Sequence, residues 1–166
     1  MYDELTKKDI EKMKEEIEYR KVTLRPKFLE DVKVARAFGD LSENYEYKEA
    51  KRVKNRNESR IRYLTNMIKT AKIIEDDSDD DTVGLYDIVE CFDCELEEEL
   101  TFRVVTTVRN QANQGMVSKE SPIGKKLLGR KAGERVEIES PDGSYWLEIR
   151  KITKAEDDGS SPISSY

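Results

Sequence analysis

The feature that most constrains this chain is a regular stripe of residues between Tyr47 and Ala71. Steps of three and four residues alternate along it, through Tyr47, Ala50, Lys54, Asn57, Ile61, Leu64, Ile68 and Ala71. Because such steps return to one face of an α-helix, the stripe is typical of a coiled-coil seam, here with a polar stretch in its middle. The segment therefore predicts a long helix that needs a partner helix.

The partner is predicted earlier in the chain, where Thr6 and Asp9 form a helix-start signal. A second stripe follows, through Ile10, Met13, Ile17, Leu24, Phe28, Val32 and Ala35. Pro26 has no amide donor, so it should kink or restart this helix, and Gly39 predicts its end. Two helical arms joined by a short turn must pack antiparallel, which predicts a coiled-coil hairpin over residues 1–74.

The rest of the chain has a different period. Residues 75–82 begin with EDDSDDD, whose like charges repel one another and predict an extended acidic linker. Over residues 83–154 apolar side chains recur with period two, which predicts β-strands. Ser121, Pro122 and Gly129 mark the cap, first residue and exit of one short helix. We therefore expect an α+β fold, with an antiparallel sheet, one short helix and a flexible tail over residues 155–166.

Composition removes several classes of protein. Charged residues make up 40% of the chain and hydrophobic residues 36%, which suits an exposed helical element beside a small core. No apolar run is long enough to cross a membrane and the first residues have no hydrophobic signal region, so we expect a cytoplasmic protein. The absence of histidine removes the commonest general base and metal ligand. Cys91 and Cys94 lack the second pair that a zinc site needs, and we interpret them as reduced thiols.

Basic charge is concentrated in the helical part. Residues 1–74 hold 19 Lys and Arg against 14 Asp and Glu, a net +5, while the remaining residues hold 11 against 22, a net −11. Four basic residues follow at a spacing of four, namely Lys48, Arg52, Arg56 and Arg60. Each like-charged pair destabilises a helix by about 0.2–0.5 kcal/mol. A track for an RNA phosphate backbone therefore explains this ridge better than a purely solvated face does. The solvated face stays open as the alternative interpretation. Tyr45 could stack on a base beside it.

Residues 39–46, between the arms, read GDLSENYE and contain the acids Asp40 and Glu43. One interpretation is a capping box, in which Asp40 caps the second arm and Glu43 reaches back to its free amide. A carboxylate offers about four acceptor sites, however, and a cap uses only one or two. Carboxylate oxygens are the ligands that Mg²⁺ prefers, so the two acids could complete a site whose other ligands belong to a partner. Capping and metal binding both stay open on the residues alone.

Two long motifs resemble those of the bacterial Gre transcript-cleavage factors. ARAFGDLSENYEYKEAK, over residues 35–51, is similar to the tip motif of that family, and SPIGKKLLGRKAGERVEIESPDG, over residues 121–143, is similar to the most distinctive stretch of its C-terminal domain. The order of parts agrees over residues 4–153, and the likeness is nearer to the GreA branch than to GreB.

The resemblance implies an antiparallel coiled coil and a C-terminal domain of FK506-binding-protein-like fold that docks on RNA polymerase. The coiled coil would enter the secondary channel, where the matching acids Asp40 and Glu43 would help hold a Mg²⁺ ion shared with polymerase and orient a water. The polymerase would then cleave its own backtracked RNA near the 3′ end. We therefore expect a monomer that is not itself an enzyme and binds no metal in isolation. The signature of the docking domain is matched by Ser121, Pro122, Ile123 and Gly124.

Three features depart from the family's pattern. Tyr45 stands where a small residue is expected, the linker is more acidic than expected, and the CFDC motif of Cys91 and Cys94 is not part of the pattern. Related proteins of the same architecture inhibit polymerase, so a channel-blocking regulator that does not promote cleavage is the alternative function. A free-standing prolyl isomerase is suggested by fold analogy alone, which is a poor ground for activity.

Overall fold

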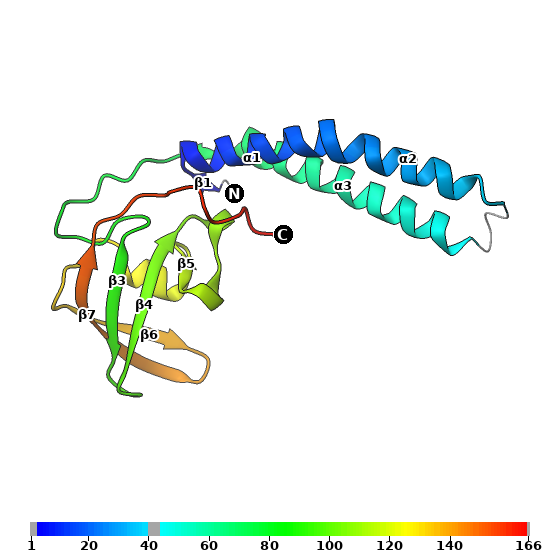
Figure 1. Ribbon diagram of the computed structural model, residues 1–166. Helices are drawn as coiled ribbons and strands as arrows, with labels where there is room; N and C mark the ends of the chain where they lie inside the picture. The colour runs from blue at the N-terminus through cyan, green and yellow to red at the C-terminus, as the bar shows by residue number, and fades with distance from the viewer. Residues whose placement is uncertain (1–2, 40–43, 166) are drawn as a thin grey trace. The chain divides into compact units, whose positions relative to one another are not determined.

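The computed structural model in Figure 1 describes residues 3–39 and 44–165. They form two compact units. We call residues 10–71 the finger, and we call residues 4–9 together with the chain from residue 72 onward the sheet unit. Residues 4–9 thus belong with the sheet unit, although the sequence assigned them to the helical arm.

The finger is built from helices that follow the two predicted stripes. Its first arm contains α1 (Lys7–Tyr19), a π-helical turn (Arg20–Leu24) and α2 (Arg25–Arg36), and its second arm is α3 (Tyr45–Thr70). Helices α2 and α3 run side by side (Figure 1). The most buried side chains of the finger come from both stripes: Met13, Ala35, Asn57, Ile61 and Leu64. The predicted pairing of the two arms is confirmed.

The first arm changes its helical period just before Pro26. In the π-helical turn, the Arg25 amide donates a hydrogen bond to the Arg20 carbonyl, five residues back. Proline has no N–H to donate and is tolerated in the first turn of a helix, which is where Pro26 lies in α2. The expected restart is confirmed, and it takes the form of one wide turn.

Thr6 and Asp9 start α1 as predicted. The Asp9 amide donates to Thr6 Oγ1 at 3.1 Å, and the Thr6 amide donates to Asp9 Oδ2 at 3.0 Å. This reciprocal arrangement is a capping box. Asp9 is fully buried in the sheet unit, where it also accepts a hydrogen bond from Thr106 Oγ1 at 2.7 Å. One side chain therefore both begins the first helix and anchors the start of the chain.

The main sheet has five strands in the order β5-β4-β3-β7-β6. Their bounds are β3 (Ile88–Asp93), β4 (Glu98–Val105), β5 (Met116–Ser118), β6 (Arg135–Ser140) and β7 (Gly143–Thr153). Neighbouring strands are antiparallel except β4 and β5, which are parallel. The sheet is therefore mixed, which corrects the expectation of a purely antiparallel one. The connecting segment, with 3₁₀ turns at Thr107–Arg109 and Ala112–Gln114, returns the chain along β4 before β5 begins.

Two smaller elements complete the sheet unit. Strands β1 (Glu4–Leu5) and β2 (Lys72–Ile73) form a parallel pair. The short helix α4 (Pro122–Leu127) begins as predicted, with Ser121 Oγ accepting a hydrogen bond from the Gly124 amide at 3.0 Å. Gly129 follows with a φ of +79°, a conformation that glycine adopts at little cost, so the predicted exit is also confirmed.

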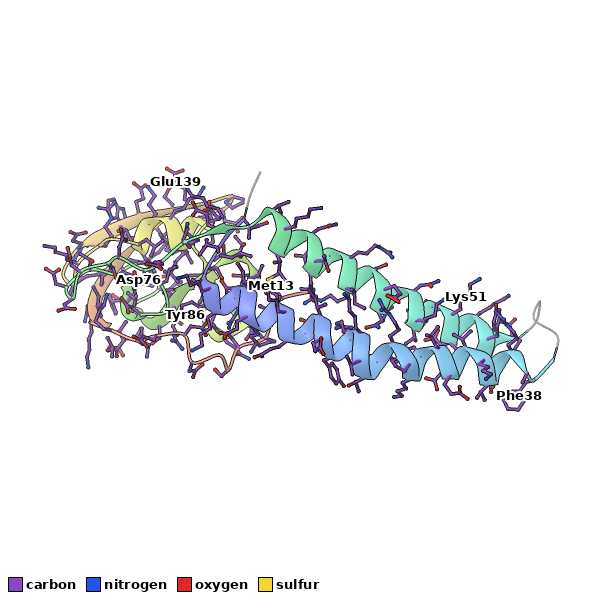
Figure 2. All side chains as sticks on the ribbon, turned by 90° about the horizontal axis from the view of Figure 1, so that it is seen from above. Met13, Phe38, Lys51, Asp76, Tyr86 and Glu139 are labelled. Atoms are coloured by element: carbon purple, nitrogen blue, oxygen red, sulfur yellow. The ribbon has the colours of Figure 1, made fainter. Side chains whose placement is uncertain are left out.

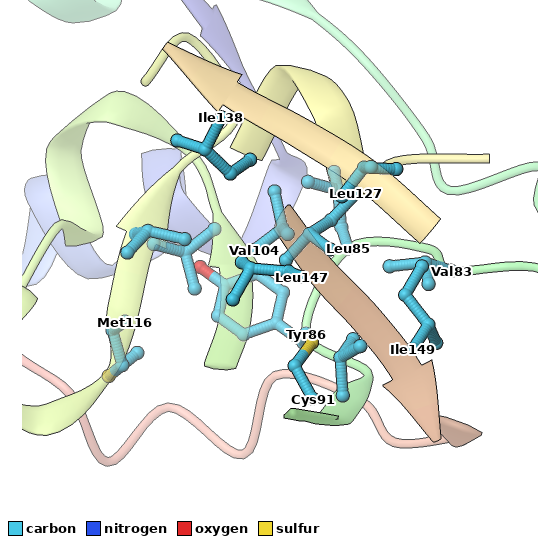
Figure 3. Close-up of a cluster of buried hydrophobic side chains, with 14 residues drawn as sticks. Val83, Leu85, Tyr86, Cys91, Val104, Met116, Leu127, Ile138, Leu147 and Ile149 are labelled. Atoms are coloured by element: carbon cyan, nitrogen blue, oxygen red, sulfur yellow. The ribbon is translucent and has the colours of Figure 1, made fainter. Parts of the chain in front are cut away.

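A continuous apolar core lies in the sheet unit (Figure 3). Period-two alternation builds it: on β3, Val89 and Cys91 are buried whereas Glu90 between them is exposed. The buried members of the cluster are Val83, Leu85, Tyr86, Val89, Cys91, Val104, Val105, Met116, Val117, Leu127, Val136, Ile138, Leu147 and Ile149. Burying one such large side chain stabilises a fold by about 1.5–3 kcal/mol, so this cluster dominates the stability of the unit.

The final segment of the chain packs onto the sheet unit around Arg109, which is fully buried. Arg109 donates to Asp157 Oδ2 at 2.8 Å and to Ser161 Oγ at 2.6 Å, and its Nε lies 2.9 Å from Asp9 Oδ1. Ile163 is buried as well. A buried guanidinium requires neutralising partners, and the tail supplies one of them. The expectation of a flexible tail is therefore corrected for residues 155–165.

The predicted acidic linker is held by lysines of the sheet unit: Lys131 pairs with Asp81 at 3.2 Å, and Lys154 makes several further contacts. Lys154 Nζ donates to Ser78 Oγ at 2.9 Å and to the carbonyl oxygens of Asp79 and Thr82, both at 3.0 Å. It also donates to the buried carboxylate of Asp87 at 2.6 Å. The segment has no helix or sheet of its own, as its repelling charges predict, but it follows the surface of the unit.

Candidate functional site

The candidate metal-holding acids Asp40 and Glu43 lie outside the described residues. The residues beside them show how the second arm begins. Asn44 is the N-cap of α3: its Oδ1 accepts a hydrogen bond from the Tyr47 amide at 3.0 Å. Its Nδ2 donates to the Ala35 carbonyl at 2.7 Å, at the end of the other arm. The capping role considered for Asp40 therefore belongs to Asn44, which corrects that interpretation.

Tyr47 and Arg36 also connect the two arms near the turn. Arg36 Nη2 donates to the Tyr47 hydroxyl at 3.3 Å, and the guanidinium lies 5.5 Å from the centre of the tyrosine ring. The hydrogen bond from Arg36 lowers the pKa of Tyr47. Tyr47 is half-buried in the seam, as its place in the stripe predicts. Together with Asn44, this contact fixes the base of the turn that carries the candidate acids.

Two aromatic side chains are exposed on either side of the turn. Tyr45 is 81% exposed and Phe38 is 72% exposed. Phe38 points away from the helices in Figure 2. The ammonium of Lys48 lies 5.6 Å from the Tyr45 ring, a distance at which a cation is attracted to an aromatic face. The RNA-binding role of Tyr45 stays a prediction, and the structure leaves most of its surface open to solvent.

The predicted basic ridge is exposed over three of its four residues. Lys48, Arg52 and Arg56 are exposed on α3, and Arg52 pairs with Glu49 at 2.6 Å. Arg60 is only 8% exposed, and its Nε donates to Glu16 Oε1 of the first arm at 3.0 Å. Arg60 therefore stabilises the pairing of the arms and does not extend the exposed ridge, which corrects that part of the expectation.

The polar middle of the seam is a connected cluster around Glu16. This carboxylate accepts hydrogen bonds from Arg20 Nε at 2.9 Å and from Arg60 of the other arm. Arg20 Nη1 in turn donates to Asn57 Oδ1 at 2.9 Å, and Asn57 Nδ2 donates to the Arg20 carbonyl at 3.3 Å. Burial raises the pKa of Glu16, but the hydrogen bonds from Arg60 and Arg20 outweigh it, so the net pKa is lowered.

The candidate docking residues around α4 have visible structural roles. Ser121 caps the helix, and Ile123 packs against the apolar core. Gly124 is buried so tightly that a Cβ atom would overlap the backbone carbonyl oxygen of Ser118. Pro122 is exposed in the first turn. The motif thus fixes the position of α4, and its proposed role in docking stays a prediction.

The remaining candidate groups are metal ligands and thiols. Nowhere in residues 3–39 and 44–165 do three Cys, Asp or Glu side chains gather as a metal site would require. Both cysteines are free, and burial raises the pKa of Cys91 to about 12, so this thiol stays protonated at neutral pH. No helix within the described ranges is long and apolar enough to cross a membrane.

Comparison with known proteins identifies the family. A family model described as "Transcription elongation factor, N-terminal" matches residues 4–73, and one described as "Transcription elongation factor, GreA/GreB, C-term" matches residues 78–154. The chain belongs to the GreA/GreB family of transcription elongation factors. Its GreA/GreB N-terminal match covers the finger with β1 and β2, and its C-terminal match covers the main sheet. Residues 155–166, from which Asp157 and Ser161 bond to Arg109, lie beyond both matches.

Individual GreA proteins are similar over nearly the whole chain. "Transcription elongation factor GreA" of Clostridioides difficile is 42% identical over 151 residues, 90% of this chain and 95% of that protein. The GreA of Bacillus subtilis is 39% identical over 149 residues, with the same coverage. Among solved structures, GreA factor homolog 1 of Thermus thermophilus matches 93% of this chain and all of its own at 28% identity and a TM-score of 0.41. The assignment to the GreA/GreB family rests on the sequence matches.

Proposed function

We propose that this protein stimulates the cleavage of backtracked nascent RNA by RNA polymerase and so rescues arrested elongation complexes. The observation that supports this most is the pair of GreA/GreB family matches, in the correct order, over residues 4–73 and 78–154. In this proposal the finger enters the secondary channel of the polymerase, and the sheet unit docks outside. The active site belongs to the polymerase, and the protein acts as an accessory factor that stimulates it.

The proposed working end is the turn between the two arms. Asn44 caps α3 and bonds to the other arm, so the cap of the second helix does not require the carboxylate of Asp40. Carboxylate oxygens such as those of Asp40 and Glu43 are hard donors that suit Mg²⁺. In proteins this ion is usually bound by carboxylates, water and phosphates together. Asp40 and Glu43 would therefore supply ligands to a Mg²⁺ ion that the polymerase holds in part. When bound, such an ion lowers the pKa of a coordinated water and stabilises charge on phosphate oxygens.

The exposed basic residues of α3 would follow the RNA or the channel wall. Lys48, Arg52 and Arg56 are exposed, and the ion pair between Arg52 and Glu49 is itself exposed and therefore weak. A phosphate group can replace such a partner. Tyr45, beside Lys48, would offer a ring face to a base near the RNA 3′ end.

A cleavage assay tests the proposal. An elongation complex stalled in a backtracked register, with 5′-labelled RNA and Mg²⁺, is mixed with the protein, and RNA length is followed. The wild-type protein is expected to shorten the RNA from its 3′ end. Asp40→Ala and Glu43→Ala are expected to lose most of this stimulation, because each removes one ligand. A variant that cleaves as fast as wild type would refute the assigned role.

Two controls separate cleavage from other effects. Glu30→Ala removes an exposed acid from α2, away from the turn, and is expected to leave stimulation unchanged. Nucleotide addition on complexes that have not backtracked is measured in parallel. Strong inhibition there without RNA shortening would support the alternative, a regulator that blocks the channel without promoting cleavage.

A further inference from the structure

A shallow groove runs between α2 and α3 on one side of the finger. It measures about 460 Å³, and its lining comes from both arms: Phe28, Asp31, Tyr45, Glu46, Glu49, Ala50 and Val53. Phe28, Ala50 and Val53 are half-buried and form an apolar floor, whereas the three acids are exposed at the rim. Neither the cleavage chemistry nor the basic ridge accounts for this combination.

Charge is sorted around this groove. Between residues 45 and 56, α3 carries two acids, Glu46 and Glu49, and both line the groove. The five basic residues of the same stretch all lie outside it: Lys48, Lys51, Arg52, Lys54 and Arg56. Lys27 and Lys48 approach the aromatic rings of Phe28 and Tyr45, but neither lines the groove. The same helix therefore presents an acidic, apolar surface beside a basic one.

The acids of the groove are available to a partner. Asp31 and Glu46 have no ion-pair partner among the described residues, and the ion-pair partner of Glu49 is the exposed Arg52. Measured exposed pairs contribute about 0–1 kcal/mol, so a new cation can replace Arg52 readily. Three carboxylates repel a phosphate backbone, which argues against RNA or DNA as the occupant.

We propose that this groove docks a protein segment that brings an apolar side chain together with a lysine or arginine. The apolar side chain would cover Phe28, Ala50 and Val53, and the cation would face the carboxylates at the rim. The inference rests on the proposed function, because a finger inside the secondary channel brings this groove against the polymerase. The partner is then the protein wall of that channel, with the RNA contacting the basic ridge instead.

Photo-crosslinking identifies the class of partner. Val53→benzoylphenylalanine places a reactive group on the groove floor, and Leu29→benzoylphenylalanine places the same group on an exposed site of α2 that does not line the groove. In a stalled complex with labelled RNA, the Val53 variant is expected to crosslink to a polymerase subunit in higher yield than the Leu29 variant. Transfer of the crosslink to RNA, or equal yields from both positions, would overturn the proposal.

Charge reversal tests the electrostatic part. Asp31→Lys and Glu46→Lys each reverse one charge in the groove, and Glu30→Lys makes the same change of net charge on α2 outside it. Each groove variant is expected to raise the Kd for polymerase about tenfold, while the control stays within about twofold. Unchanged affinity in both groove variants would contradict the inference.

Measurements on the wild-type protein distinguish failure of the groove proposal from failure of the proposed function. If wild type binds polymerase and shortens RNA while both groove variants bind equally well, the groove proposal alone is wrong. If wild type neither binds polymerase nor shortens RNA, the proposed function is wrong, and the groove proposal is wrong with it.

Discussion

The finger and the sheet unit bury their side chains in different ways. The sheet unit has a continuous apolar core, with Leu147 and Ile149 fully buried. The seam of the finger is apolar only in part, and its middle is the hydrogen-bonded cluster of Glu16, Arg20 and Asn57 with Arg60. Apolar burial is strong but has no direction. Hydrogen bonds between arms form only at one alignment, so the finger gives up some stability for a defined register.

The largest expected effect is the loss of a core side chain from the sheet unit. Leu147→Ala leaves a cavity and is expected to destabilise that unit by about 3 kcal/mol. Trp146, the only tryptophan of the chain, lies on β7 and reports on this unit by fluorescence, whereas circular dichroism at 222 nm reports mainly on the finger helices. The fluorescence transition in urea should move and the helical one should move less. Equal shifts would show that the two units unfold together.

The next largest loss of stability is expected from overpacking at α4. In Gly124→Ala the new methyl group meets the Ser118 backbone, which cannot move freely, and the expected cost is about 2 kcal/mol. The exposed neighbouring site gives a control, since Pro122→Ala is expected to change little. A Gly124→Ala protein that unfolds like wild type by fluorescence would contradict the tight packing of this glycine against the Ser118 backbone.

The polar centre of the finger is expected to contribute less to the free energy of unfolding. Glu16→Gln keeps the shape of the side chain but removes the charge that Arg20 and Arg60 share, and the expected loss is about 1.5 kcal/mol. Here the helical transition should move and the Trp146 transition should not. A shift in the fluorescence transition instead would contradict the assignment of this cluster to the finger.

Lowering the pH should remove the stability that the charge of Glu16 contributes. Because the folded-state pKa of Glu16 is lowered, its contribution is complete above the ordinary carboxyl value of 4.5 and is lost as pH falls through the folded-state pKa. Wild type and Glu16→Gln should therefore differ in stability at pH 7 and converge well below pH 4.5. A difference that persists at the lowest pH would point to packing instead of charge.

The smallest expected effect is at the turn. Asn44→Ala removes the N-cap of α3 and the hydrogen bond to the Ala35 carbonyl, at a cost of about 1 kcal/mol. Asn44→Asp retains a capping oxygen but loses the amide donor to the other arm, so it should recover part of the loss. Thermal unfolding followed at 222 nm measures both. If Asn44→Ala is as stable as wild type, the cap is not needed to hold the arms.

Local rules predicted much of this fold. The two stripes, the helix start at Thr6 and Asp9, the restart at Pro26 and the short helix after Ser121 all depend on residues close in sequence. Capping of α3 by Asp40 was one of two open interpretations, and it was wrong: Asp40 and Asn44 are both good capping residues, and the spacing to Glu43 favoured the first. Asn44 caps the helix and also bonds to Ala35, nine residues away, a contact that the local spacing does not reveal.

Features set by distant contacts were not predictable. A ridge at a spacing of four drifts around a helix by about 40° a step, so Lys48 is exposed whereas Arg60 reaches the seam. The sequence alone does not show how far the partner helix extends around that face. The tail has no periodicity, yet Asp157 and Ser161 pack on Arg109, about fifty residues earlier in the chain. The parallel pairing of β4 and β5 likewise depends on the path of a connecting segment.

The placement of residues 4–9 makes the finger an insertion within the sheet unit, which the chain leaves after Asp9 and re-enters at Lys72. The two units are therefore nested and not consecutive. A fragment cut to begin at Lys72 would lack the β1 partner of β2 and the carboxylate beside the buried guanidinium of Arg109. We expect a C-terminal module to keep these contacts if it carries residues 4–9, joined to Lys72 by a short loop in place of the finger.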